Sequence, residues 1–456
     1  SNTVLKTNTL LIDTPQSVTA ISKEFMQDQS VQSVADSVRY VPGVTAAQGE
    51  GNRDALVFRG NITTGDFFVD GIRDDVQTYR DFYNTERLEV LKGPNGMIFG
   101  RGGAGGVFNR VTKEAGWKPI RELSLSYGSY NQKRTSIDIG DAINDIAAFR
   151  INAVYEKSDS YRHGVDLERY GINPTVTIQP SDQTKIVLGV EYFKDSRIAD
   201  RGVPSLQSGA NSSATKNLGN RPYRINDYSQ FFGNAKLSPT ETETKAFNAS
   251  IEHTFDNGIT IKNKTRYADY DKFYQNVFAD SSVNSSGNLN LGGYYDATDR
   301  KNLINQTDLT FDFKTLYIQH QFLVGMEIGS QRTDNSRLTA ANINDISALN
   351  PINPSAILFN TLARQQKSTV DILGLYMQDQ IRLTEHWQAI IGLRHDKFKT
   401  SYDGFSNGPS SFISENVTDN LLSPRAGLIF KPQNNISFYT NYSLSYVPRA
   451  GDQLTS

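Results

Sequence analysis

One stretch of the chain has the spacing of a nucleotide-binding loop. Residues 93–113, GPNGMIFGRGGAGGVFNRVTK, carry G-x-G-x-x-G from Gly100 to Gly105, a pattern that lets backbone amides approach a pyrophosphate. That chemistry needs a strand before the loop and a long helix after it. The residues that follow are rich in Val, Phe and Asn, reach Pro119 quickly and make a poor helix. The glycines, with Gly93 and Gly100 as structural residues of the loop, are therefore expected to permit tight turns and close backbone approach.

The titratable residues form no catalytic or metal-binding motif. The chain has no cysteine, which excludes disulfides and thiolate metal sites. The five histidines are His163, His253, His320, His386 and His395. None stands in an H-x-x-x-H pair or beside an obvious nucleophile, and of the five only His163 is expected near a turn or loop. Three acidic residues share one segment, where a solvated face is a better reading than a cation site: Asp74, Asp75 and Asp81. We expect no catalytic residue, no metal and no cofactor.

The composition favours β structure over a helical globule. The 47 basic and 49 acidic side chains nearly balance, so no surface for nucleic acid is indicated. The chain combines 22 Tyr, 24 Phe and 35 Gly with 37% hydrophobic residues, a mixture that suits strands and turns. No stretch approaches the length of an apolar membrane helix. On composition alone, a soluble all-β protein is the simplest alternative.

The chain divides into two regions with different patterns. Residues 1–117 are expected to form a compact α+β domain. Ser22 is a candidate N-cap for one helix, whose apolar residues follow at helical spacing until Pro42 and Gly43 stop it. Short strands, each closed by glycine, are expected at 55–60, 66–71 and 87–93.

Residues 118–456 consist mainly of long strands with period-two alternation. In 146–157, apolar and aromatic residues occupy one face and Arg, Asn and Glu the other. The same alternation runs through 316–329 and 371–383, and His320 shares the apolar face of its strand. Ordinary strands average about 5–6 residues, whereas a tilted strand that crosses a membrane needs about 9–11. The length of these segments therefore indicates strands that cross a membrane.

The connections between these strands alternate in length. We count about thirteen strand segments between residues 121 and 447. Short turns on one side and long loops on the other are typical of an outer-membrane β-barrel. A large soluble β-sandwich, the alternative, needs neither such strands nor such unequal connections. The tight turns are expected near 144 and at 181–182, and the long polar connections at 198–245, 276–300 and 332–366.

Several segments resemble one known family, the TonB-dependent outer-membrane receptors. Five of them look like the family's plug domain: IDTPQSVTAISKEF (12–25), VADSVRYVPGV (34–44), VFRGN (57–61), FFVDGIRDD (67–75) and ERLEVLKGPNGMIFGRGGAGGVFNRVTK (86–113). Two more look like its barrel strands: LGLYMQDQIRLTEHWQAIIGLRHDKF (373–398) and LSPRAGLIFKPQNNISFYTNYSLSYVPRAGDQL (422–454). The resemblance spans nearly the whole chain in the right order. Within the family, the sequences of these segments most resemble those of siderophore receptors of the ferric-catecholate branch.

The resemblance implies a transmembrane antiparallel β-barrel that contains a plug. The plug domain would be residues 1–117 and the barrel domain 118–456, and a barrel wide enough to hold the plug has about 22 strands. At roughly 26 residues per strand, such a barrel would need about 570 residues. We therefore expect that C-terminal barrel strands are missing from this chain.

The resemblance also implies a function. The protein would be an outer-membrane receptor and active transporter for a ferric siderophore, with a catecholate as the expected cargo. Its partners would be TonB with the inner-membrane complex that energises it, the ferric siderophore, and outer-membrane lipids. The receptor would act as a monomer, bind no nucleic acid and use no cofactor. The alternatives left open are a hydroxamate siderophore, haem or cobalamin as cargo, a passive plugged receptor, and an outer-membrane hydrolase.

The ligand would bind on the outward face, between plug apices at 46–54, 71–84 and 95–103 and the long loops. A ferric tris-catecholate is a rigid aromatic trianion, so arginine and aromatic rings suit it. Arg59 and Arg110 are expected to brace the plug against acidic barrel residues. Arg101 could serve either as such a brace or as a ligand residue. The ligand candidates are Arg53, Arg73, Gln77, Tyr79, Arg80, Phe99 and Arg101 (the one that could share the bracing role) in the plug and Arg201, Tyr223, Tyr294 and Tyr295 in the loops.

Overall fold

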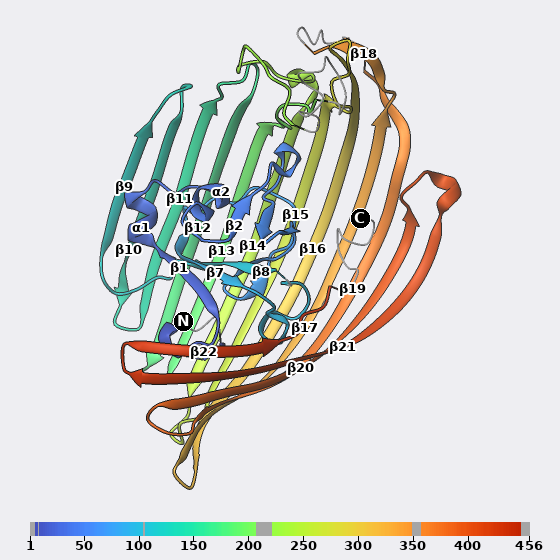
Figure 1. Cartoon of the computed structure of the whole chain (residues 1–456). Helices are drawn as coiled ribbons and strands as arrows, with labels where there is room; N and C mark the ends of the chain where they lie inside the picture. The colour runs from blue at the N-terminus through green and yellow to red at the C-terminus, as the bar shows by residue number, and fades with distance from the viewer. Residues whose placement is uncertain (1–4, 8, 104, 207–220, 349–356, 448–456) are drawn as a thin grey trace.

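A small N-terminal domain lies in the concave face of one large curved sheet (Figure 1). The computed structural model describes residues 5–7, 9–103, 105–206, 221–348 and 357–447. Parts of the expected long connections (207–220 and 349–356), Ala104 of the glycine motif and the end of the last barrel motif (448–454) lie outside the described residues.

In its described residues the N-terminal domain, the plug, contains two sheets and three short α-helices. Its larger sheet has the order β1-β7-β8-β5-β6 and is formed by β1 (Ser17–Ser22), β5 (Phe67–Val69), β6 (Ile72–Arg73), β7 (Thr85–Lys92) and β8 (Gly106–Thr112). The smaller sheet contains β2 (Val44–Ala46), β3 (Leu56–Phe58) and β4 (Asn61–Thr63). The helices are α1 (Lys23–Asp28), α2 (Val34–Val38) and α3 (Gly96–Phe99). The strands expected at 55–60, 66–71 and 87–93 are confirmed as β3, β5 and β7.

The single helix expected after Ser22 is wrong, because two helices are present. Ser22 does cap the first, since its hydroxyl accepts a hydrogen bond from the Phe25 amide at 3.3 Å. Ser30 then adopts a left-handed conformation with φ 52°, which ends the first helix. Ser33 caps the second helix by accepting from the Asp36 amide at 3.2 Å. A second N-cap residue inside the apolar pattern therefore divides the segment.

The glycine-rich loop is followed by strand β8, not by a long helix, so the fold around it is not that of a dinucleotide site. Gly93 and Gly100 have φ values of 92° and 73°, which other residues rarely adopt. A Cβ on Gly106 would lie 2.4 Å from the carbonyl oxygen of Leu91. Glycine here permits turns and the close approach of β8 to β7.

The second region is an antiparallel sheet in which consecutive strands are neighbours. Thirteen of its fourteen strands form one continuous path and β18 pairs beside β16, so the expected number of about thirteen is confirmed. The strands are β9 (Ile120–Tyr127), β10 (Lys133–Asn144), β11 (Ala147–Asp159), β12 (Asp166–Ser181), β13 (Thr184–Ile198), β14 (Pro239–Thr254), β15 (Thr260–Ala279), β16 (Asn288–Thr315), β17 (Ile318–Ala340), β18 (Ile343–Ser347), β19 (Phe359–Arg382), β20 (Trp387–Phe405), β21 (Ile413–Gln433) and β22 (Ile436–Ser443).

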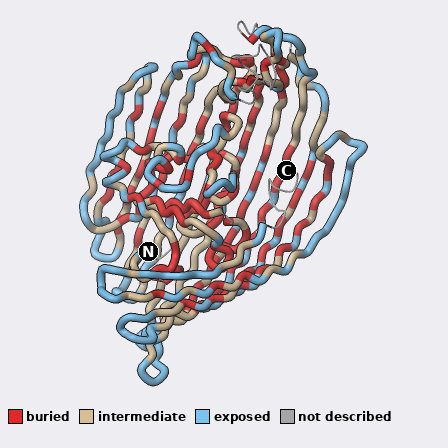
Figure 2. Tube along the Cα trace, viewed as in Figure 1, coloured by how far each residue is buried: buried red, intermediate tan, exposed pale blue. Residues whose placement is uncertain are grey.

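The two faces of the sheet differ as their alternation predicts. In β19, Leu375 and Met377 are about half exposed, whereas Tyr376 and Gln378 between and beside them are buried. Figure 2 shows the same alternation of buried and exposed positions along the neighbouring strands. The apolar face therefore points outward and the polar face points toward the plug. No helix in the described part of the chain has the length and apolarity needed to cross a membrane.

The connections alternate in length, but the strands reach further than the sequence indicated. The turns expected near 144 and at 181–182 are tight, as the bounds of the flanking strands show. Much of the expected loop 276–300 belongs to β15 and β16, and β16 alone has 28 residues. The polar residues in this segment continue the backbone pairing of the two strands beyond their apolar part. A change to polar sequence therefore did not show where these strands end. Leu316, expected inside a strand, lies in the turn before β17 with φ 57°.

Candidate functional site

The plug meets the long-connection end of the sheet at Glu50. Its carboxylate accepts hydrogen bonds from Tyr294 at 2.8 Å and Arg53 at 2.7 Å, and Arg201 lies 3.6 Å away. Arg201 also donates to the hydroxyls of Tyr274 at 3.0 Å and Tyr294 at 2.9 Å. These residues come from the plug apex, the connection after β13, and the ends of β15 and β16.

Arginines on the neighbouring strands extend this group. Arg337 at the end of β17 lies 4.2 Å above the Tyr294 ring and forms an ion pair with Asp296 at 2.7 Å. Arg364 at the start of β19 is its direct cross-strand partner. The guanidinium of Arg201 stacks 3.6 Å from the ring of Phe278. We call these nine residues the apical cluster: Glu50, Arg53, Arg201, Tyr274, Phe278, Tyr294, Asp296, Arg337 and Arg364.

The apical cluster combines an excess of positive charge with aromatic rings. Four arginines face two carboxylates, Glu50 and Asp296, and three aromatic side chains lie among them. Guanidinium groups hydrogen-bond to anionic oxygens and stack on aromatic faces. This arrangement can bind a large anion with aromatic character.

Three of the loop and plug candidates are brought together in the apical cluster, namely Arg53, Arg201 and Tyr294. Tyr295, the next residue along β16, points to the other face and packs against Phe273 at 5.3 Å between ring centroids. Both tyrosines lie in β16 and not in a loop as expected, and Tyr295 lies on the face of the strand opposite to the apical cluster. Tyr223 is partly buried against a separate apolar group under the long connections that includes Leu206, Ile225 and Val283.

The two remaining candidates, Gln77 and Tyr79, are half-buried and make contacts outside the apical cluster. Gln77 donates to the Thr64 hydroxyl at 3.3 Å. Tyr79 packs beneath Arg197, whose guanidinium lies 4.0 Å from the ring centroid. Burial raises the pKa of Tyr79 to about 12, although Arg197 opposes the shift. Tyr79 is therefore a neutral hydrogen-bonding group at neutral pH.

Four plug candidates are buried and make contacts within the protein, so the structure does not place them on the outward face. Arg73 donates to the carbonyl oxygens of Gly65, at 2.7 Å, and of Arg101. Arg101 forms an ion pair with Asp75 at 3.0 Å and a hydrogen bond to Gln331 of the sheet. The apices expected from sequence point partly into the molecule. The four corrected candidates are Arg73, Arg80, Phe99 and Arg101.

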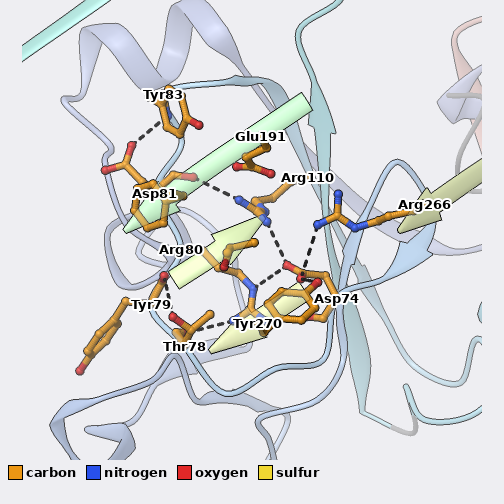
Figure 3. A pocket seen from close by; sticks show the side chains of 12 residues that line it. Asp74, Thr78, Tyr79, Arg80, Asp81, Tyr83, Arg110, Glu191, Arg266 and Tyr270 are labelled. Atoms are coloured by element: carbon orange, nitrogen blue, oxygen red, sulfur yellow. Dashed lines mark hydrogen bonds and ion pairs between the residues drawn. The ribbon is translucent and has the colours of Figure 1, made fainter. Parts of the chain in front are cut away.

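The three aspartates expected at a solvated face are buried instead. Figure 3 shows Asp74 in a cleft between the plug and strands β13 to β15. It accepts hydrogen bonds from Arg80 at 3.2 Å, Arg110 at 2.9 Å and Tyr270 at 2.7 Å, and Arg266 lies 3.9 Å away. Burial opposes ionisation, but these cations hold the pKa of Asp74 well below its usual range.

Asp81 and Asp75 connect the plug to the sheet in the same way. Asp81 forms ion pairs with Arg134 at 2.7 Å and Arg169 at 3.1 Å, on β10 and β12. Asp75 pairs with Arg300 of β16 at 3.1 Å. In both cases burial is outweighed by the arginines, and the pKa lies below its usual value. We call Asp74, Asp75 and Asp81 with Arg134, Arg169, Arg266 and Arg300 the plug anchor.

The polarity of this anchor reverses the sequence expectation. Arg110 does not brace the plug against acidic barrel residues, because its ion pair is with Asp74 of the plug itself. Arg59 is exposed at a turn with φ 48°, and no ion pair of it is found among the described residues. Within the plug anchor the plug supplies the carboxylates and the sheet supplies the arginines. Elsewhere lysines of the plug pair with acidic residues of the sheet, as Lys113 does with Asp138 at 3.0 Å. Inward-facing arginines on separate strands carry no local sequence signal.

Buried Asp54 predicts an unusual pH dependence of plug stability. Burial raises the pKa of its carboxyl to about 6, against the opposing charge of Arg80. The folded plug then binds this proton more tightly than the unfolded chain does, so its stability should rise as pH falls from about 7 to 4, by an amount on the order of 1–3 kcal/mol. Below about pH 4, protonation of Asp74, Asp75 and Asp81 should reverse the trend.

Urea unfolding of the plug across pH 3–8 measures this effect, and Asp54→Asn is the matched variant. The variant should lose the rise in stability between pH 7 and 4 and keep the fall at lower pH. A wild-type midpoint that declines steadily from pH 7 downward would contradict the assignment of Asp54.

Family models match both regions of the chain. The model for the TonB dependent receptor-like β-barrel covers residues 181–456, and the model for the TonB-dependent receptor plug domain covers residues 11–107. The chain belongs to the family of TonB-dependent receptors.

Fiu and PiuA are two of the relatives to which this TonB-dependent receptor is similar in both sequence and structure. The catecholate siderophore receptor Fiu of Escherichia coli K12 is 28% identical over 96% of this chain and 62% of its own length. The probable TonB-dependent siderophore receptor PiuA of Acinetobacter baumannii is 27% identical over the same shares. The chain therefore spans 62% of the length of these curated relatives.

Their crystal structures have the same fold. The open form of the ferric-catecholate import receptor Fiu superimposes with a TM-score of 0.85, at 26% identity, over 96% of this chain and 71% of its own. The siderophore receptor PiuA gives 0.86, also at 26% identity, over 96% and 65%. Members of the family are outer-membrane β-barrels that act as transport receptors, so this receptor is an outer-membrane protein.

Among the described residues, no hydrogen bond or ion pair joins a histidine of the receptor to the apical cluster. His163, in the connection after β11, bonds to the Ser229 hydroxyl at 2.8 Å. The expectation that no other histidine lies near a turn is wrong, because His386 occupies the turn before β20. His320 packs on Phe313 and bonds to Asp379 at 2.8 Å, as an interfacial residue would.

Sequence reasoning missed six members of the apical cluster: Glu50, Tyr274, Phe278, Asp296, Arg337 and Arg364. One available signal is that Tyr270, Tyr274 and Phe278 recur at even spacing and so share the inward face of one strand. Glu50 stands between Gly49 and Gly51, which marks a tight apex. The arginines become neighbours only through strand pairing.

Proposed function

We propose that this receptor imports a ferric siderophore of the catecholate class across the outer membrane, with energy supplied by TonB. The apical cluster is the observation that carries the proposal. Its four arginines outnumber its two carboxylates, and three aromatic rings lie among the guanidinium groups. A ferric tris-catecholate, as an aromatic trianion, is complementary to this positive charge and to these aromatic rings. The name of Fiu, a catecholate siderophore receptor, supports the same cargo class, and the name of PiuA supports a siderophore as cargo.

Binding in this proposal is noncovalent, and no bond of the cargo is made or broken. The cargo sits above the plug, so transport requires the plug to yield while the sheet stays intact. The outer membrane holds no nucleotide to drive this step, and the proposed energy source is therefore a periplasmic partner, TonB, that pulls on the plug.

Uptake of a radiolabelled ferric catecholate by cells that carry the receptor, with and without TonB, tests the proposal. Accumulation should require both the receptor and TonB, while binding at the cell surface should require the receptor alone. Uptake that does not depend on TonB would contradict active transport and would favour a passive plugged receptor. Conversion of the ligand by the purified protein would favour a hydrolase.

A further inference from the structure

The carboxylate of Glu50 is surrounded as a bound anion would be. Arg53 and Tyr294 donate to one oxygen at 2.7 and 2.8 Å, and Arg201 lies 3.6 Å from the other. Burial alone would raise the pKa of Glu50, but Arg201 and Arg53 hold it below its usual value. Glu50 is thus an ionised carboxylate in the centre of a basic site.

The backbone at this point is not in a relaxed conformation. Glu50 has φ 60°, between Gly49 at 61° and Gly51 at 73°. A residue with a Cβ adopts this left-handed region at a cost that surrounding contacts must offset. Those contacts include a hydrogen bond from the Tyr274 hydroxyl to the Glu50 carbonyl oxygen at 3.3 Å. Tyr274, whose hydroxyl accepts a hydrogen bond from Arg201 at 3.0 Å, therefore helps to hold the apex in this strained form.

The apex also contacts the backbone of Asp200, in the connection after β13. Gln48 donates to the carbonyl oxygen of Asp200 at 2.6 Å, and a Cβ on Gly51 would lie 2.5 Å from the Asp200 backbone. Asp200 directly precedes Arg201, so the apex and the central arginine of the site are mechanically linked. A ligand that moves Arg201 must also change the contacts of the apex.

Positive charge in the cluster exceeds what Glu50 and Asp296 neutralise. Arg337 pairs with Asp296 at 2.7 Å, but within the described part of the chain no ion pair is found for Arg364, its cross-strand neighbour. Among the nine residues of the apical cluster, Glu50 is the only carboxylate that comes from the plug. Any polyanion that enters the cluster competes with that carboxylate for Arg201.

We propose that Glu50 is an internal substitute for the cargo: its carboxylate occupies the anion position of the empty receptor, and a ferric catecholate displaces it and frees the Gly49–Gly51 apex. This inference rests on the proposed function for the identity of the anion. Displacement releases the strained apex on the plug side when the site is filled. The plug thereby receives a signal that cargo is bound, because the same arginine cannot hold both anions.

An internal competitor lowers the apparent affinity of the ligand that must replace it. Glu50→Gln keeps the shape of the side chain and removes its charge, so it should lower the Kd for an iron(III) tris-catecholate complex about 3- to 10-fold. Glu24→Gln, an exposed plug glutamate on α1, is the control for the change in net charge and should leave the Kd unchanged. In an Arg201→Gln background, the gain from Glu50→Gln should fall below about 2-fold.

Hydrogen exchange of residues 46–54 gives a second readout. In the wild-type receptor the complex should increase exchange at these amides, and in Glu50→Gln exchange should already be fast without it. Equal Kd values for Glu50→Gln and Glu24→Gln, or slower exchange on binding, would contradict the substitution model. If the wild type binds no complex, the proposed function is contradicted. The release of the apex is tested separately: without the complex, an exchange rate of residues 46–54 in Glu50→Gln that equals the wild-type rate would contradict it.

Discussion

Replacing Asp81 with Asn is expected to destabilise the plug by about 3–5 kcal/mol, the largest stability effect of any single change in the anchor. The side chain is fully buried and pairs with Arg134 and Arg169, which would then share only Glu156, at 2.6 Å from each. Two buried guanidinium groups with one carboxylate leave an uncompensated charge. Urea unfolding of the plug in the detergent-solubilised receptor measures the loss.

The matched control is Asp141→Asn. Asp141 also pairs with an arginine, Arg121, but at an exposed position on β10, where solvent screens the interaction. The control should leave the unfolding midpoint unchanged. If both variants unfold at the wild-type midpoint, Asp81 does not anchor the plug.

Arg201→Gln is expected to weaken binding of a ferric tris-catecholate about 10- to 100-fold, or roughly 1.4–2.8 kcal/mol. Arg201 supplies charge at the centre of the apical cluster, and its guanidinium is already oriented by Phe278 at 3.6 Å and by two tyrosine hydroxyls. Glutamine retains hydrogen-bonding capacity but loses both the charge and the stacking. Titration of the purified variant with the ferric complex gives the affinity.

Two further variants separate position from charge. Arg224→Gln removes an exposed arginine from the same connection and should change the Kd less than 2-fold. Arg201→Lys keeps the charge but not the planar group, and should give an intermediate affinity. An Arg201→Gln receptor that binds as tightly as the wild type would remove Arg201 from the ligand site.

Much of the fold follows from local pattern. Period-two alternation identified the membrane strands and the face that each presents outward, because a strand buries every second residue. The plug strands closed by glycine were also identified. Strand ends were not, since backbone pairing extends β16 through polar residues that resemble a loop. The break between α1 and α2 depended on two serines: Ser30 has a positive φ, and Ser33 caps the second helix.

The site could be predicted only in part, for physical reasons that particular residues illustrate. Tyr294 and Tyr295 have the same chemistry, yet the strand places one in the apical cluster and the other on the opposite face. Asp81 looked like a solvated acid because its two arginine partners stand on strands remote in sequence. Composition suggests which residue types bind an anion. Strand register and the seating of the plug decide which of them meet.

Binding of ferric complexes to the wild-type receptor tests the central claim most directly. We would titrate it with the iron(III) complexes of a small catechol and of a hydroxamate, and with haem, following the quenching of tryptophan and tyrosine fluorescence. The account predicts saturable quenching by the catecholate complex and none by the other two. Saturable binding of the hydroxamate complex or of haem, with no response to the catecholate, would contradict it.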